Sequence, residues 1–214
     1  NRISGSENLT RAIRWAQATM TKDGLANVRA EKVMVPRWVR GQESAVIVDP
    51  PEHPIVMLGL GGRVATPPAG VEADVLVVKD FKDLEARGAQ AKGKIVLFNV
   101  PYTTYGETVA YRGGGATAAA KHGAVAAFVR AVGPMGLRTP HTGGMNYGDG
   151  AAKIPAAAIA AEDANRIQRL SDRGLRVRVR LKMEAKFEAD AESAHVFGEI
   201  VGREQDRVTA ADLP

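Results

Sequence analysis

Residues 133–150 form the most polar stretch of a chain that otherwise alternates between apolar runs and charged surface segments. This glycine-rich stretch carries side chains that donate and accept hydrogen bonds, at Arg138, Thr139, His141 and Tyr147. The chemistry that they could do is recognition of a polar substrate. Connections of this length without regular structure are often functional. Two readings stay open, a substrate-facing loop and a surface loop with a hydrogen-bonded histidine.

Metal chemistry needs clustered ligands, and the sequence offers few. The chain has no cysteine and four histidines that lie far apart, His53, His122, His141 and His195. It contains neither His-x-Asp nor His-Glu-x-x-His, and a scattered histidine is usually a surface or packed residue. We therefore assign no metal ligand and no catalytic residue within these 214 residues.

Composition limits the classes of protein to which the chain can belong. The chain has 214 residues, is 45% hydrophobic and 25% charged, and carries a net charge of +5. The clearest basic feature is residues 176–182, RVRVRLK, whose alternation predicts a strand with one wet face. Without interleaved aromatic residues it does not favour nucleic-acid binding. No run of 18 apolar residues and no leader occurs, so nothing in the sequence is expected to span a membrane or direct secretion. Prior removal of a signal peptide stays open.

The stretch that organises the rest runs from residue 93 to residue 132. Apolar runs at 95–98 and 124–129 predict two buried strands, and the Ala-rich segment between them predicts a crossover helix. The glycine triplet at 113–115 is predicted to be a loose turn, with the helix proper beginning near Ala116.

Elsewhere the pattern predicts helices at about 6–22 and 162–170 and a short one near Phe81. Ser4 and Glu7 have the spacing of a capping box for the first helix. An extended segment is expected from residue 28 until Pro36 ends it. Further strands are predicted at 45–48, 55–60, 71–78, 156–160, 175–183 and 193–201, and a frayed tail at 203–214.

Several motifs in one order carry a resemblance. GKIVLFN at 93–99, KHGAVAAFVR at 121–130 and KIPAAAIAAEDANRI at 153–167 resemble a protease-associated domain. The segments SGSENL, VPRWVRGQESA, GLGG with TPP, LRTPHTGG and VRLKMEAK are similar to the carboxypeptidase Q group of zinc metallopeptidases. The resemblance extends from residue 2 to about residue 203.

The resemblance implies a mixed α/β (α+β) fold with three parts. Residues 1–43 would be the N-terminal helix and strand of a peptidase domain, residues 44–186 a β-rich protease-associated domain, and residues 187–214 a return strand and tail. In the resembled enzymes the zinc ligands and the catalytic Glu lie beyond the last of these strands. The chain alone would then lack zinc and be inactive, while the parent enzyme would hold two zinc ions.

In those enzymes the protease-associated domain overhangs the cleft, which makes Arg138, Thr139, His141 and Tyr147 candidates for touching substrate. The parent would be a secreted or periplasmic exopeptidase acting on small peptides. Expected partners are the remainder of the catalytic domain, a small peptide and a second copy of the chain, with no nucleic acid and no membrane. The alternative is a self-contained, non-enzymatic module that binds a peptide or protein.

Overall fold

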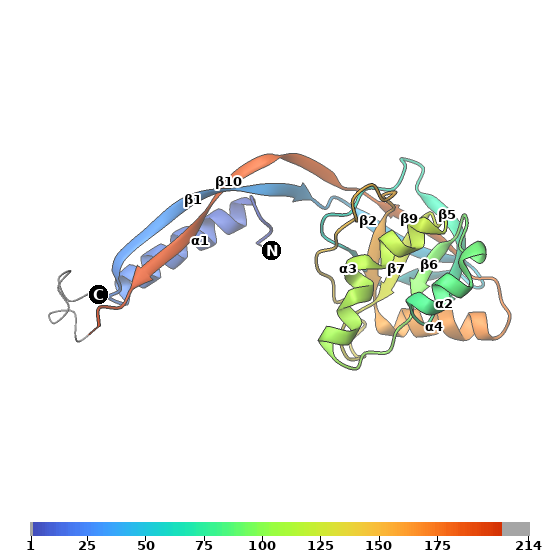
Figure 1. The fold of residues 1–214 in the computed structure, drawn as a ribbon. Helices are drawn as coiled ribbons and strands as arrows, with labels where there is room; N and C mark the ends of the chain where they lie inside the picture. Colours follow the sequence, from blue (N-terminus) through green and yellow to red (C-terminus); the bar gives the residue numbers. More distant parts are fainter. Residues whose placement is uncertain (1, 203–214) are drawn as a thin grey trace, which may run out of the picture. The chain divides into compact units, whose positions relative to one another are not determined.

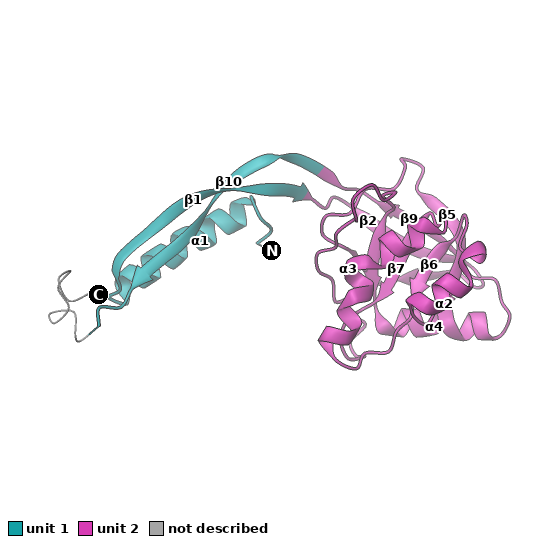
Figure 2. Cartoon of the chain, in the orientation of Figure 1, with its two compact units in different colours: residues 1–38, 187–214 teal, residues 39–186 magenta. Residues whose placement is uncertain are grey.

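The chain divides into two compact units (Figure 2). The structure is a computed structural model that describes residues 2–202. The first unit combines residues up to Trp38 with those from Phe187 onward, and the second comprises residues 39–186. The tail predicted at 203–214 lies outside the described residues.

The first unit contains one helix and a two-stranded sheet. Helix α1 (Glu7–Lys22) lies along the sheet formed by β1 (Ala26–Val39) and β10 (Lys186–Glu199) (Figure 1). The helix is where the sequence predicts it, but the capping box is wrong. Ser6 is the N-cap, and its hydroxyl accepts a hydrogen bond from the amide of Leu9 at 3.3 Å.

Both strands of this sheet are longer than predicted. Strand β1 continues through Pro36, which was expected to end it, and β10 begins at residue 186 rather than at residue 193. Proline removes one backbone N–H donor, and each strand of a two-stranded sheet has one edge whose N–H groups face no partner strand. A proline on that side therefore does not stop the strand.

The second unit is built on an eight-stranded mixed sheet in the order β3-β2-β9-β5-β6-β7-β8-β4. The four central strands from β5 to β8 are parallel, and the outer strands pair antiparallel. The strands are β2 (Glu43–Asp49), β3 (His53–Ile55), β4 (Met57–Gly59), β5 (Val71–Val78), β6 (Ile95–Phe98), β7 (Ala126–Arg130), β8 (Ala156–Ile159) and β9 (Arg178–Met183).

The predicted strand, helix, strand unit is confirmed as β6, α3 (Tyr105–Lys121) and β7, and β6 and β7 pair in parallel. The predicted loose turn at 113–115 is wrong, because the glycine triplet lies inside the helix. A Cβ on Gly115 would stand 2.9 Å from the Phe98 ring, whereas Gly113 and Gly114 have open space around them. Helix packing against the ring thus accounts for one glycine of the three.

Helices cover both faces of this sheet (Figure 1). Helices α2 (Phe81–Ala86) and α3 pack with one core cluster that includes Phe98, and α4 (Ala161–Asp172) packs with the other cluster, which includes Phe128. A short 3-10 turn (Gly88–Gln90) follows α2. Among residues 2–202, no helix is both long and apolar enough to cross a bilayer.

The basic strand β9 is neutralised from the neighbouring strand β5. Glu72 forms ion pairs with Arg178 at 3.0 Å and Arg180 at 2.9 Å, and Asp74 lies 3.4 Å from Arg178 and 3.8 Å from Arg176. These cations therefore contribute to pairing between strands. The absence of nucleic-acid binding stays a prediction.

Candidate functional site

Residues 133–150, the polar loop, connect β7 to β8 and are held to the rest of the second unit by their backbone. Gly143 accepts a hydrogen bond from the Gly61 amide at 2.9 Å, and Met145 donates one to the Gly61 carbonyl at 3.0 Å. The hydroxyl of Thr142 donates to the Gly59 carbonyl at 3.1 Å. The middle of the loop is thereby fixed beside the turn that follows β4.

Arg138, the first candidate of the loop, is tied to helix α4. Its Nη2 lies 2.8 and 3.0 Å from the two carboxylate oxygens of Asp163, whose side chain is buried. Asp163 also accepts from the Val56 amide at 2.8 Å, and Nε2 of His53 lies 3.6 Å from it. Arg138 compensates a buried carboxylate, so its main contacts are structural.

Tyr147, at the other end of the loop, has a structural setting as well. Its hydroxyl accepts from the amide of Val64 at 3.2 Å and donates to the carbonyl of Ile154. Burial raises the pKa of this phenol. The ring packs against the α3 side of the sheet, so Tyr147 closes the loop onto the segment before β8.

Thr139 and His141 are the two candidates that remain exposed. The Thr139 hydroxyl has only a local contact, 3.5 Å from the Leu137 carbonyl. The ring of His141 stands edge-on to the ring of Tyr105 on α3, with 6.3 Å between centroids. Of the four candidates, these two are free to meet a ligand.

Beneath this part of the loop lies an arginine that the sequence analysis did not select. Arg112 is one of the buried residues of α3 and, although it is an arginine, only 8% of it is exposed. Its Nη2 donates to the hydroxyl of Tyr105 at 2.7 Å, and its guanidinium lies over that ring at 5.4 Å. The sequence analysis began this helix near Ala116 and therefore missed that Arg112 is four residues from Thr108 and from Ala116, both of which are buried in α3.

Gly143 is the residue that covers Arg112. A Cβ built on Gly143 would stand 2.6 Å from Cζ of Arg112 and 2.9 Å from its Nε and Nη1. Only a glycine lets the loop backbone approach the guanidinium so closely. The glycines of this loop are thus partly explained by what lies beneath them.

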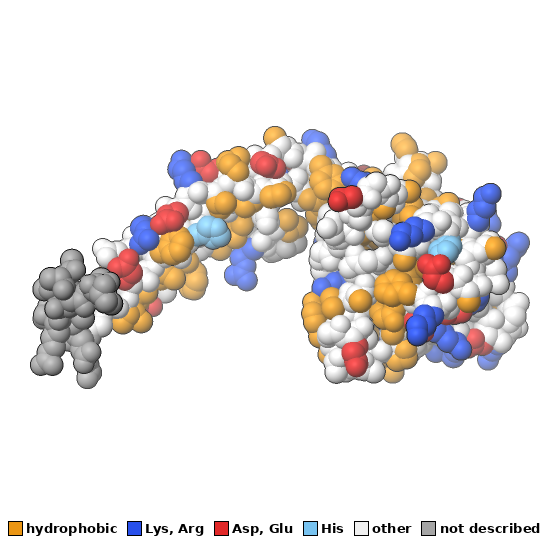
Figure 3. Space-filling model, viewed as in Figure 1, with side chains coloured by type: hydrophobic (Ala, Val, Ile, Leu, Met, Phe, Trp, Pro, Cys, Tyr) orange, Lys and Arg blue, Asp and Glu red, His pale blue; other side chains and the backbone are white. Residues whose placement is uncertain are grey.

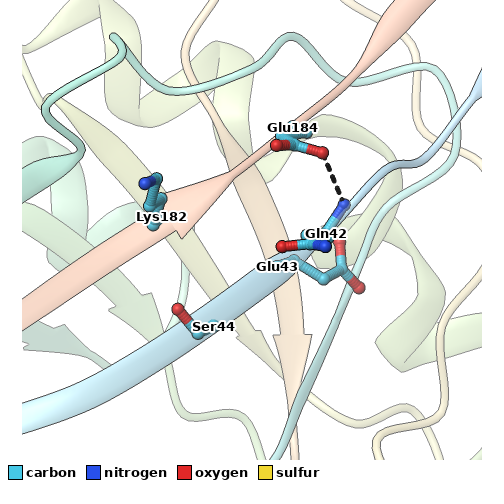
Figure 4. Close-up of a pocket in the computed structure, with 5 residues that line it drawn as sticks. All are labelled: Gln42, Glu43, Ser44, Lys182 and Glu184. Carbon is cyan, nitrogen blue, oxygen red and sulfur yellow. Dashed lines mark hydrogen bonds between the residues drawn. The ribbon is translucent and has the colours of Figure 1, made fainter.

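A second polar group of the same unit lies at the start of β2 and the end of β9. A pocket there is lined by Gln42, Glu43, Ser44, Lys182 and Glu184 (Figure 4). The backbone N–H of Gln42 donates a hydrogen bond to the Glu184 carboxylate at 2.8 Å.

Next to this pocket, Arg63 is fully buried and pairs with Glu43 at 2.5 Å. Burial lowers the pKa of Arg63, although the Glu43 carboxylate acts in the opposite direction. Glu43 also accepts from the Gly59 amide at 2.8 Å. The arrangement ties β2, β4 and the turn after β4 together, which gives it a structural role.

The histidines do not converge. Within residues 2–202, no group of three or more His, Cys, Asp or Glu side chains is placed to hold a metal ion. His53 lies beside Asp163, His122 lies 3.2 Å from Glu85, and His195 neighbours the ring of Phe197. Each has a separate environment, and His141 is the one in the polar loop.

Comparisons with known proteins give the chain its context. No family model matches the sequence. It is 47% identical over 202 residues to carboxypeptidase Q of Xenopus laevis and 45% identical over 201 residues to that of Homo sapiens. Each alignment covers 94% of this chain and 43% of the relative. The chain therefore spans less than half the length of these relatives.

Solved structures agree. A peptidase M28 precursor from Shewanella amazonensis superposes with a TM-score of 0.87 at 35% identity, covering 91% of this chain and 46% of that one. A zinc aminopeptidase from Bacillus subtilis gives a TM-score of 0.61 at 20% identity, over 92% of this chain and 42% of that one, which shows the fold alone.

Fold and comparisons together define a mixed α/β segment that is similar to part of a solved peptidase. More particularly, the chain is a segment of a carboxypeptidase Q-like peptidase, as the motifs in its sequence indicated.

Proposed function

We propose that the chain is the non-catalytic N-terminal portion of a zinc-dependent exopeptidase that hydrolyses small peptides. The observation that carries the proposal is the identity of 45–48% to carboxypeptidase Q along 94% of the chain. In this proposal two zinc ions are bound by the part of the enzyme beyond the described residues. The parent enzyme is secreted or periplasmic.

Residues 44–186 act in this proposal as a protease-associated domain that covers the cleft and helps to select substrate or to form a dimer. Support comes from the eight-stranded sheet of residues 39–186, which forms a compact unit by itself. In this proposal Thr139 and His141 of the polar loop meet the peptide, and the exposure of both side chains supports that role.

The remainder of the catalytic domain is the partner that we assign to the first unit. Helix α1 has no buried residue, and Trp15, Met34 and Phe187 are 68%, 59% and 61% exposed. Hydrophobic side chains are visible along the surface of this unit (Figure 3). Apolar surface of this extent on so small a unit favours association. A peptidase domain completed around α1, β1 and β10 would cover it.

Kinetics of the longer enzyme test the role of the loop. Thr139→Ala combined with His141→Ala should raise KM for dipeptides or shift the preference among them, while Asp149→Ala in the same loop serves as the matched control. Unchanged kinetics for the double variant across a dipeptide panel would remove the loop from substrate selection. It would also favour the alternative, a binding module without a part in catalysis.

A further inference from the structure

Arg112 is a buried cation whose charge is not matched by any carboxylate of the described chain. It is 8% exposed, and among residues 2–202 no Asp or Glu lies within ion-pair distance of its guanidinium. Arginine is rarely this buried without a charged partner. Its Nε is buried and has no acceptor within the same described residues.

The groups that do surround Arg112 are neutral. The hydroxyl of Tyr105 accepts from Nη2 at 2.7 Å, the Tyr105 ring lies on one side, and the backbone of Gly143 lies against the guanidinium. A phenol and an aromatic face stabilise a cation only in part. The site is therefore organised around a positive charge that no carboxylate among residues 2–202 balances.

We propose that Arg112, Tyr105 and Gly143 form a recognition site for a carboxylate group of a small peptide. The planar guanidinium fork matches the two oxygens of a carboxylate, and a single guanidinium balances a single negative charge. At Gly143 only backbone lies against the guanidinium, because a Cβ there would stand 2.6 Å from Cζ and 2.9 Å from Nε and Nη1. Tyr105 is 49% exposed and, with His141, forms the outer border of the site.

The inference rests on the proposed function for its choice of a peptide carboxylate, because Thr139 and His141 belong to the loop that is proposed to meet substrate. It adds the chemical group that is recognised and the buried residue that recognises it. The binding itself can be measured on the chain as it stands, without catalysis. Its failure and the failure of the proposed function are therefore separate results.

The experiment is a titration of the 15N-labelled chain with acetate and with N-acetylglycine at constant ionic strength, followed through the arginine Nε–H signals. The Arg112 signal, identified by its absence in Arg112→Gln, should shift saturably. Arg178→Gln, which alters a surface arginine paired with Glu72, should bind as the wild type does.

Two adjacent glycines supply a matched pair that does not alter the arginine itself. Gly143→Ala places a methyl group against the guanidinium and should weaken carboxylate binding by about tenfold, the loss expected for a charge-assisted hydrogen bond. Gly144→Ala, whose Cβ meets nothing within 4 Å, should bind normally.

The proposal is overturned by the absence of a saturable shift, by equal binding in Gly143→Ala and Gly144→Ala, or by tighter binding of inorganic phosphate than of either carboxylate. If Arg112→Gln does not fold, the glycine pair decides the question alone.

Discussion

Nη2 of Arg138 lies 2.8 and 3.0 Å from the carboxylate oxygens of Asp163, a side chain that is only 3% exposed. Arg138 belongs to the polar loop and Asp163 to the first turn of α4, 25 residues further along the chain. The pair holds the beginning of the loop, which precedes β8 in the sequence, to helix α4, which follows β8.

Arg138→Gln should lower the free energy of unfolding by about 1–2 kcal/mol, because it leaves a buried carboxylate with less compensation. The loss is smaller than for a fully buried pair, since Arg138 is 41% exposed and Asp163 keeps its hydrogen bond from the Val56 amide. Urea unfolding measures the change. Arg176→Gln, whose side chain is 73% exposed, is the control, and an equal effect of both variants would contradict the assignment.

Two glycines of helix α3, Gly113 and Gly115, should change stability in opposite directions when each is replaced by alanine. Gly113→Ala should stabilise the fold by about 0.5–1 kcal/mol, because alanine favours the helix and the site is open. Gly115→Ala should destabilise it by about 1–3 kcal/mol, because the new methyl group overlaps the Phe98 ring. Thermal and urea unfolding test both, and stabilisation by each variant would show that α3 does not pack on Phe98 as described.

Glu43 and Glu72 each bridge two arginines, but only Glu43 does so in the interior. Glu43→Gln should cost about 2–4 kcal/mol, because it leaves the fully buried Arg63 without its carboxylate. Glu72→Gln removes two exposed pairs and should change stability little. Equal unfolding midpoints for the two variants would argue against a structural role of the Arg63–Glu43 pair.

Tyr147 should make stability depend on alkaline pH. Burial raises the pKa of its phenol above the ordinary 10.0, so the unfolded chain loses this proton first. The contribution is fully present below the unfolded pKa and is lost as pH rises through the folded pKa. Urea titrations across this range should show a smaller loss for Tyr147→Phe than for the wild type.

Tyr147→Phe should also be less stable at neutral pH, by about 1–3 kcal/mol, since the Val64 amide and the Ile154 carbonyl lose their partner. Tyr102→Phe, at an exposed tyrosine, should reproduce neither effect. An identical alkaline response of the two variants would place the raised pKa elsewhere.

Buried strands were the part of the fold that the sequence predicted best. The run at 95–98 matches β6 residue for residue, because a strand buried on both faces is an unbroken apolar run between turn residues. The prediction at 71–78 also matches β5, although Glu72 and Asp74 interrupt the first half of that strand. Local propensity misled at Gly115 and Pro36, where contact with the Phe98 ring and a free strand edge decide the outcome.

The candidate site was predicted less well, because polarity marks a loop but not the partners of its side chains. Arg138 and Tyr147 contact Asp163, Val64 and Ile154, none of which is near them in the loop sequence. Arg112 lies in an Ala-rich helix that gives no sign of a site until Gly143 is placed over it. Contacts between distant segments decide these roles.

The most direct test of the whole account is zinc-dependent hydrolysis of a dipeptide panel by this chain and by a version extended through its downstream coding sequence. The account predicts that only the extended protein is active and that a chelator abolishes its activity. Hydrolysis by residues 1–214 alone would contradict the non-catalytic assignment, and inactivity of both proteins would contradict the proposed peptidase.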